Sequence, residues 1–167
     1  YDTTNDNACS VWTSAGTNTS VGLAGLAPGT TYYWHVRATN ASGTTYANGS
    51  ATAFWSFAVV PVPGAFNKTA PANGATGQAT SPTLTWGTSA AATGYAYCHD
   101  TTNDNACSAW ASAGTTSSVG LSGLTPGATY YWHVRATSAS GTTYATRSAT
   151  PFWSFAVLPV PPQSHVL

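Results

Sequence analysis

The chain has 167 residues, of which 43% are apolar and only 5% are charged, and its formal net charge at pH 7 is zero. Ordinary globular domains carry roughly 25% charged residues, so solubility here depends on Thr, Ser and Asn. The basic residues Arg37, Lys68, Arg135 and Arg147 are scattered singly, which excludes the clustered basic face of a nucleic-acid-binding protein. No run approaches the roughly 18 apolar residues of a membrane span, so we expect no membrane insertion. With so few carboxylates, we expect stability nearly flat from about pH 3 to about pH 9.

The sequence repeats itself with an offset of 98 residues, since residue 2 aligns with residue 100. Residues 2–59 align with residues 100–157 without a gap, and 11 of these 58 positions differ, which leaves 47 identical. The run TYYWHVRAT, for example, occurs at Thr31–Thr39 and again at Thr129–Thr137. A period near a hundred residues is the size of one small β-sandwich. We therefore expect an array of one module.

The offset leaves residues 66–98 without a counterpart in the first copy. We predict a partial module at residues 1–60, a Pro-rich linker at 61–65, a complete module at 66–158 and a Pro-rich tail at 159–167. Such Pro-rich segments are stiff and extended, so they should keep successive modules apart. A first module without its early strands exposes a core face and an unpaired edge. The missing strands come either from upstream polypeptide, which we favour, or from a neighbouring subunit by strand addition.

Both copies carry the hexapeptide DTTNDN, at residues 2–7 and 100–105, and it holds all four carboxylates: Asp2, Asp6, Asp100 and Asp104. Oxygen-rich loops of this kind can bind calcium, which takes six to eight oxygen ligands. The spacing lacks the pattern of an EF-hand loop, and no Glu follows. Asp and Asn also favour turns because they bond to their own backbone. The two interpretations are a structural turn, which we favour, and a Ca²⁺ site.

Short alternating runs rich in Thr, Val, Tyr and Trp, separated by Gly, Pro, Asn and Ser, predict an antiparallel all-β fold. In the complete module we expect strands near residues 67–70, 80–86, 93–99, 108–113, 117–121, 128–138 and 151–157. Seven strands is the number in a simple immunoglobulin-like sandwich. The predicted fold class is therefore all-β, with tandem immunoglobulin-like sandwiches of which the first lacks its N-terminal strands.

Alternation along residues 129–136 assigns the two faces of the longest predicted strand. The more apolar face, expected in the core, carries Tyr130, Trp132, Val134 and Ala136. The opposite stripe, expected to face solvent, carries Tyr131, His133 and Arg135, with the twin set Tyr33, His35 and Arg37 in the first copy. A flat aromatic ring beside two hydrogen-bonding groups can stack on a sugar, so this stripe is the candidate glycan-binding surface. The alternative is that aromatic–Arg pairs across strands only stabilise an exposed sheet face.

The segment Leu124-Thr-Pro-Gly-Ala-Thr-Tyr130, followed by Val134 and Ala136, resembles the L-x-P-G-x-x-Y…V-x-A pattern of fibronectin type III domains, and residues 26–38 repeat it. Residues 83–86 resemble the B-strand tryptophan motif of that family, and residues 153–155 the closing strand of its bacterial members. The resemblance implies that Tyr130 and Tyr32 are corner tyrosines, whose hydroxyls bond to the backbone of the preceding loop. It is specific for the fold and says little about a ligand.

The chain departs from this family in its cysteines, because most members have no disulfide. Cys98 and Cys107 are the first and last residues of a ten-residue loop between two predicted strands, and we expect a disulfide to close it. Disulfides persist in oxidising compartments, which favours an extracellular or cell-surface location. The third cysteine, Cys9, aligns with Cys107, and its partner would lie one residue before Tyr1.

The leading functional hypothesis is a structural or adhesive segment of an extracellular, bacterial repeat protein: a stiff spacer whose copies can assemble into a fibre or sheath. Its partners would be other copies, adjoining modules or glycans. The alternative is a carbohydrate-binding accessory module of a secreted polysaccharide-degrading enzyme. Because the chain has no Glu and none of the common catalytic motifs, we predict no enzymatic activity and, calcium aside, no cofactor.

Overall fold

The structure, a computed structural model, describes residues 1–162, so the end of the predicted tail lies outside the described residues. The chain divides into two compact units, Tyr1–Pro61 and Val62–Leu167, which are described separately below. Its helical content is limited to two short 3-10 turns, η1 (Ala47–Gly49) and η2 (Ala145–Arg147), within the part described. No helix in residues 1–162 is long and apolar enough to cross a membrane.

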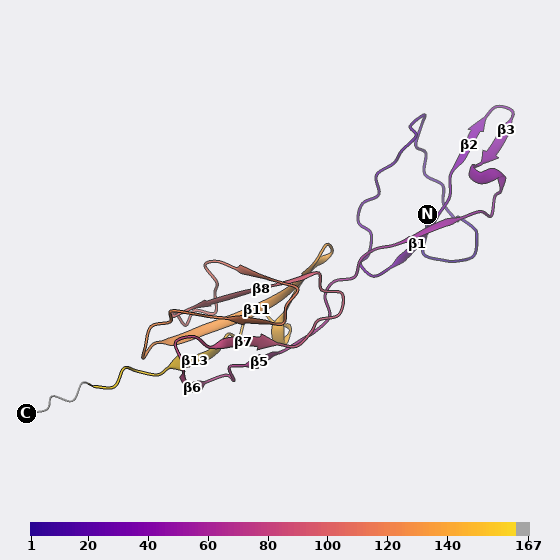
Figure 1. The fold of residues 1–167 in the computed structure, drawn as a ribbon. Helices are drawn as coiled ribbons and strands as arrows, with labels where there is room; N and C mark the ends of the chain where they lie inside the picture. The colour runs from indigo at the N-terminus through magenta and orange to yellow at the C-terminus, as the bar shows by residue number, and fades with distance from the viewer. Residues whose placement is uncertain (163–167) are drawn as a thin grey trace, which may run out of the picture. The chain divides into compact units, whose positions relative to one another are not determined.

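The second unit is a sandwich of two sheets (Figure 1). The smaller sheet has the order β10-β7-β5, with β5 at Lys68–Ala70, β7 at Thr83–Trp86 and β10 at Ser118–Gly120. The larger has the order β6-β13-β11-β8-β9, with β6 at Ala75–Gln78, β8 at Gly94–Asp100, β9 at Ala111–Gly114, β11 at Thr129–Ser138 and β13 at Trp153–Val157; β12 at Gly141–Tyr144 also pairs with β11. This two-layer arrangement confirms the predicted all-β fold class.

The core lies between these two sheets. Leu84 and Trp86 on β7 point inward from the smaller sheet, and the apolar face of β11 meets them from the larger one. The four residues expected on that face are all buried: Tyr130, Trp132, Val134 and Ala136. Burying an aromatic or aliphatic side chain of this size contributes about 1.5–3 kcal/mol relative to leaving it exposed. The face assigned from alternation is therefore confirmed.

Two strands of the second unit, β6 and β12, were not predicted from the sequence. β6 runs parallel to β13, and β12 pairs antiparallel with the second half of β11. Their sequences, ATGQ and GTTY, are too short and too polar to show an apolar alternation, so only their sheet neighbours define them. β9 also begins later than expected, at Ala111, and residues 108–110 precede it as a loop.

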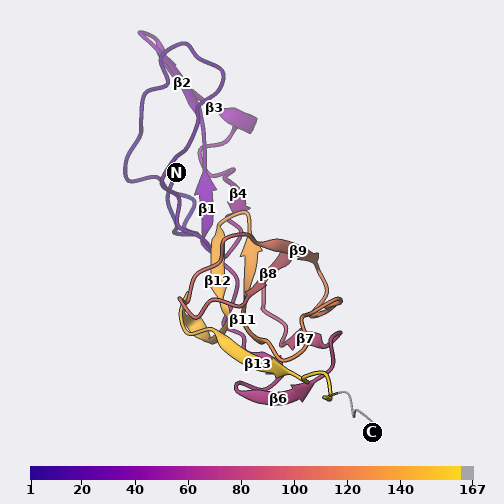
Figure 2. The same cartoon turned by 90° about the vertical axis from the view of Figure 1, so that its left-hand side faces the viewer.

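The first unit has two separate two-stranded sheets: β1 (Thr31–Trp34) pairs with β4 (Trp55–Ala58), and β2 (Arg37–Asn40) with β3 (Gly43–Tyr46). Both pairings repeat the register of β11 with β13 and with β12. Apart from a single bridge between Asp2 and Tyr33, residues 1–30 form a long loop without strands (Figure 2).

The strand that is continuous in the second unit is interrupted in the first at His35 and Val36. In the second unit, β8 pairs with residues 131–137 of β11 and so bridges the gap between β13 and β12. No strand occupies the corresponding edge of the first unit, so His35 and Val36 lack the strand pairing that their counterparts have. The interruption of the strand is the local consequence of this missing partner.

Candidate functional site

His133, expected on the solvent-facing stripe, is fully buried, so that expectation is wrong. Its ring lies among those of Trp110, Tyr144 and Phe152, with centroid distances of 6.4, 5.7 and 5.1 Å. Its Nε2 is 2.7 Å from the carbonyl oxygen of Ser148. The loop before β9, strand β12 and the segment before β13 cover the outer side of β11 and close over the imidazole. These four residues form what we call the histidine cluster.

The first unit builds the same cluster from the matching residues. The His35 ring lies 6.3, 5.6 and 5.0 Å from the rings of Trp12, Tyr46 and Phe54. His35 Nε2 is 2.7 Å from the carbonyl oxygen of Ser50, as His133 is from Ser148. The repeated histidine is therefore used in packing in both copies.

The arginines of the predicted stripe stack on the tryptophans of these clusters. The Arg135 guanidinium carbon lies 4.3 Å from the centre of the Trp110 ring, and that of Arg37 lies 4.1 Å from the centre of the Trp12 ring. Such cation–π contacts contribute about 0.5–1 kcal/mol at exposed sites and more when desolvated. Tyr131, Tyr33 and Arg135 remain partly exposed and Arg37 exposed. The central histidine is buried in the second unit, whereas His35 in the first is partly exposed.

Lys68, the only lysine of the chain, is buried with an exposed fraction of 3%. Its Nζ lies 3.2 Å from His133 Nδ1, 3.1 Å from the Pro151 carbonyl oxygen and 3.5 Å from the Trp132 carbonyl oxygen. It reaches β11 where pairing with β13 ends, at Trp132, and pairing with β12 has not begun. Because β11 is paired with neither β13 nor β12 at this point, backbone carbonyl oxygens are left that can accept a hydrogen bond from a side chain. This site was not predicted from the sequence, because nothing in the sequence of β5 indicates that its lysine points inward.

Burial shifts the proton equilibria of both groups. It lowers the pKa of Lys68 to about 7. Burial, and then the nearby charge of Lys68, lower the pKa of His133 to about 4, although the hydrogen bond to Ser148 opposes the shift. At neutral pH His133 is therefore uncharged. Because the Ser148 carbonyl can only accept, Nε2 carries the proton and Nδ1 accepts from Lys68.

These shifts correct the expectation of stability that is flat with pH. That expectation counted carboxylates alone, whereas the titrating groups here are a buried amine and a buried imidazole. Both groups bind a proton more weakly in the folded chain than in the unfolded chain, so low pH destabilises the folded state.

The four aspartates lie in two matching loops and act as turn formers. Asp2 Oδ1 accepts from the Thr4 amide at 3.0 Å, and Asp6 Oδ1 accepts from the Ala8 amide at 2.9 Å. Asp100 and Asp104 make the same bonds two residues along the chain, both at 2.9 Å. Residues 1–162 contain no group of three or more His, Cys, Asp or Glu side chains placed to hold a metal ion. Calcium binding at these loops stays a prediction, to be tested by calorimetric titration.

Cys98 and Cys107 form a disulfide, with their Cα atoms 6.0 Å apart. The bond joins β8 to the loop that precedes β9. Cys9, the counterpart of Cys107, is a free thiol of intermediate exposure.

The corner tyrosines act as the family resemblance implies. The Tyr130 hydroxyl oxygen accepts from the Thr125 amide at 3.0 Å, and the Tyr32 hydroxyl oxygen accepts from the Ala27 amide at 2.9 Å. Each hydrogen bond joins the start of its strand to the preceding loop, at a residue five positions earlier in the sequence.

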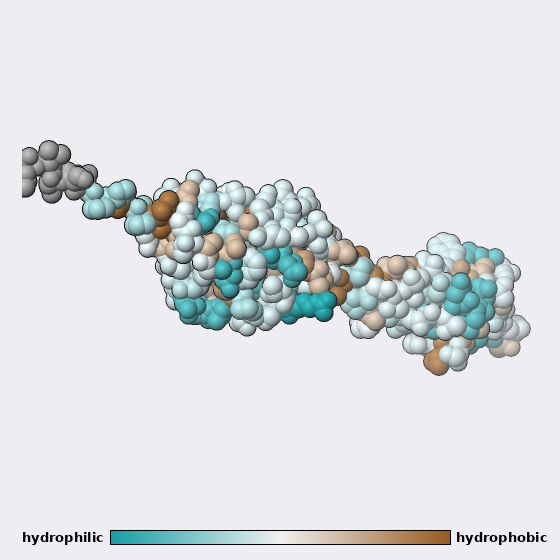
Figure 3. Space-filling model, turned by 90° about the horizontal axis from the view of Figure 1, so that it is seen from below, coloured by the Kyte–Doolittle hydropathy of each residue, from teal (hydrophilic) through white to brown (hydrophobic). Residues whose placement is uncertain are grey.

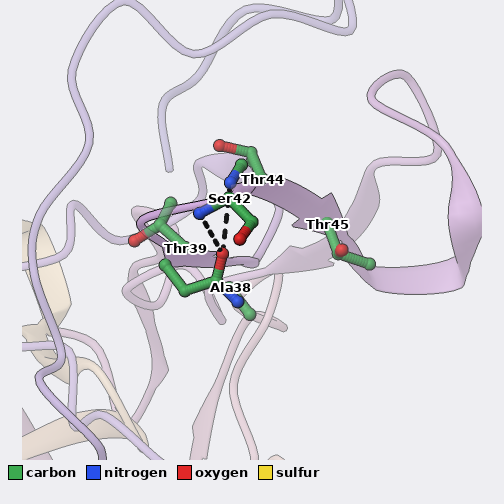
Figure 4. Close-up of a pocket in the computed structure, with 7 residues that line it drawn as sticks. Ala38, Thr39, Ser42, Thr44 and Thr45 are labelled. Carbon is green, nitrogen blue, oxygen red and sulfur yellow. Dashed lines mark hydrogen bonds between the residues drawn. The ribbon is translucent and has the colours of Figure 1, made fainter.

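A shallow hollow at the β2–β3 hairpin has no side chain that could act as an acid, a base or a charged ligand (Figure 4). Small polar residues line it, and Asn40 Oδ1 inside the turn already accepts from the amides of Ser42 and Gly43 at 2.8 and 3.1 Å. The lining has no titratable side chain, so the hollow is a feature of the hairpin turn.

No protein-family model and no curated protein matches this chain. Among solved structures, it is similar to FN3tt mut, a fibronectin type III domain, at 19% identity and a TM-score of 0.39, over 58% of this chain and 96% of the other. It is also similar to the FN1–FN3 domains of chicken CNTN1, at 17% identity and a TM-score of 0.45, over 80% of this chain and 45% of the other.

The second unit's own sheet order and buried aromatic core define its class as an immunoglobulin-like β-sandwich. The site residues that recur in both units pack against one another as clusters of aromatic rings. The protein is thus an all-β protein with an internally repeated sequence.

Proposed function

We propose that the chain is a non-enzymatic structural or adhesive segment of an extracellular repeat protein, in which copies of the module serve as stiff spacers. The observation that carries this proposal is the use made of the repeated residues. The histidine, its three aromatic neighbours and the stacked arginine recur at matching positions and pack in both units. A repeat that preserves packing residues in this way supports a mechanical role more than a reactive one.

The surface is consistent with such a role. In the view of Figure 3, most of it lies near the middle of the hydropathy scale, as expected of a chain with 5% charged residues. The disulfide supports an oxidising, extracellular location.

The spacer role is tested by small-angle X-ray scattering on chains that join one, two and three copies of residues 1–167. A stiff spacer adds a nearly constant increment to the maximum dimension with each copy. Growth of the maximum dimension as the cube root of copy number would show collapse into a globule and would reject the role.

A second candidate is carbohydrate binding, favoured by the partial exposure of Tyr131, Arg135 and Trp110 on one side of the second unit. Aromatic rings of this kind stack on sugars. The test is a glycan array with the wild type and Tyr131→Ser, leaving His133 unchanged because that residue is buried. Loss of signal in the variant is the expected result, and equal signals from both proteins would reject the stripe as the binding surface.

A further inference from the structure

The two units provide a controlled comparison, because the same residues are buried in one and exposed in the other. Val134 is fully buried, whereas its counterpart Val36 is 52% exposed. Leu121 is 7% exposed and its counterpart Leu23 is 38% exposed. The apolar side of the first unit, which we call the open face, comprises Leu23, Trp34, Val36, Ala38 and Trp55.

The second unit shows what covers this face. There, β5 and β7 of the smaller sheet pack over the equivalent residues, and β8 pairs with the edge of β11. All three strands lie within residues 66–100, and residues 66–98 have no counterpart within residues 1–61. The open face thus has the shape and chemistry to receive a segment of that sequence.

A hollow of about 240 Å³ on the open face identifies one side chain of the occupant. Its lining includes Trp34, His35, Ala53 and Trp55. The matching residues in the second unit surround Lys68: Trp132, His133, Pro151 and Trp153. A lysine with its aliphatic stem and terminal donor is therefore the side chain that this hollow fits.

Cys9 supplies an independent indication. Its counterpart Cys107 is bonded to Cys98 on β8, and Cys98 pairs with His133 in the sheet. A strand added in the β8 position beside His35 would carry its cysteine next to Cys9. The bridge between Asp2 and Tyr33, which repeats the pairing of Asp100 with Tyr131, sets the register for such a strand.

We propose that the open face binds a polypeptide segment with the sequence pattern of residues 66–99, whose lysine fills the hollow and whose cysteine bonds to Cys9. The segment adds a β8-like strand to the unpaired edge and covers the apolar residues with β5- and β7-like strands. The docking of such a segment does not depend on the spacer role, so failure of either test leaves the other intact.

The covalent step is a thiol–disulfide exchange. The segment's cysteine is presented as a mixed disulfide with a small aromatic thiol, and the Cys9 thiolate attacks the cysteine sulfur. The new disulfide forms as the old one breaks, the small thiol leaves as a thiolate, and the Cys9 proton passes to solvent. No further oxidant is needed.

The test uses the full chain and a synthetic peptide of residues 66–99 whose Cys98 carries 5-thio-2-nitrobenzoate, so that release of the coloured thiolate reports the exchange. A docked peptide gives Cys9 an effective concentration in the millimolar range, so at about 10 µM peptide we expect release roughly 100-fold faster than from a peptide with Leu84→Asn and Trp86→Asn. Mass spectrometry of the product should find Cys9 joined to Cys98, and Cys9→Ser should release nothing beyond background.

A matched pair of variants separates docking from simple thiol reactivity. Val36→Asp places a charge on the open face and should slow release to the rate of the substituted peptide. Val11→Asp, at a position 72% exposed whose counterpart Ala109 is also exposed, should leave the rate unchanged. Equal rates for the two peptides, or unimpaired release by Val36→Asp, would overturn the proposal. So would a stable dimer of the chain alone by analytical ultracentrifugation, since a second copy would then occupy the face.

Discussion

The burial of Lys68 makes the stability of the folded state depend on pH, because it lowers the pKa of the amine to about 7. The unfolded chain holds a proton on this amine up to about its ordinary pKa of 10.5, whereas the folded chain does so only up to about 7. Between these values the unfolded state binds more protons, so the free energy of unfolding rises with pH. This behaviour could not be predicted from the sequence, because a single lysine in a polar strand ordinarily points to water.

We predict that the free energy of unfolding of the wild type rises between pH 7 and pH 9.5 by up to about 1.4 kcal/mol per pH unit. Lys68→Met keeps the side-chain volume and removes the titrating amine, so its stability should be nearly constant over this window. Urea unfolding at a series of pH values measures both. A rise of the same slope in the variant would show that another group is responsible.

His133 adds a second dependence at lower pH. Its folded pKa of about 4 lies below its ordinary value of 6.5, so stability is lost as pH falls through that interval. Lys68→Met should retain part of this acid dependence, because burial is the larger cause of the lowered His133 pKa and the charge of Lys68 the smaller. The remaining dependence serves as an internal control for the variant's fold.

We predict that His133→Ala destabilises the second unit by about 2–4 kcal/mol, since it removes a fully buried ring and its bond to Ser148. Tyr131→Ala, at the neighbouring partly exposed position, should cost less. Denaturant unfolding compares the two. Equal stability of His133→Ala and the wild type would mean that the imidazole faces solvent after all.

At the scale of elements, alternation assigned the inner face of β11 correctly but could not assign its outer face. The burial of His133 depends on Trp110 before β9, Tyr144 on β12 and Phe152 before β13, which meet only in the folded sheet. The position of Lys68 depends likewise on where pairing passes from β13 to β12. Local pattern fixes which side of a strand is apolar, whereas long-range contacts decide whether the other side is covered.

The corner tyrosine offers a test of one such local bond. We predict that Tyr130→Phe lowers the stability of the second unit by about 1 kcal/mol, because the Thr125 amide loses its acceptor. Tyr131→Phe, whose ring lies at the partly exposed surface, is the matched control and should change stability by less than about 0.5 kcal/mol. Thermal unfolding that ranks the two variants in the opposite order would contradict the assignment.

The disulfide should stabilise β8 against the loop that follows it. A loop of ten residues gives a chain-entropy contribution of about 2.5–3 kcal/mol, so Cys98→Ala with Cys107→Ala should lose about this amount. Reduced wild type should behave like the double variant in urea. A double variant as stable as the oxidised wild type would show that the bond contributes nothing.

At the scale of the whole molecule, the two copies of the repeated sequence fold differently. The second unit closes a core between two sheets, and the first presents the matching residues on an open face, although 47 of 58 aligned positions are identical. The physical difference is that residues 66–99 cover the core face of the second unit, whereas the matching face of the first unit is exposed. Sequence comparison located this difference, but only the structure shows the hollow and the unpaired edge it leaves.

Hydrogen exchange measured by mass spectrometry on the full chain tests this central claim most directly. Amides of Trp34–Thr39 should exchange much faster than those of Trp132–Thr137, because only the second set is paired to β8. Added peptide of residues 66–99 should then slow exchange in Trp34–Thr39 alone. Equal protection of the two segments in the chain by itself would contradict the account.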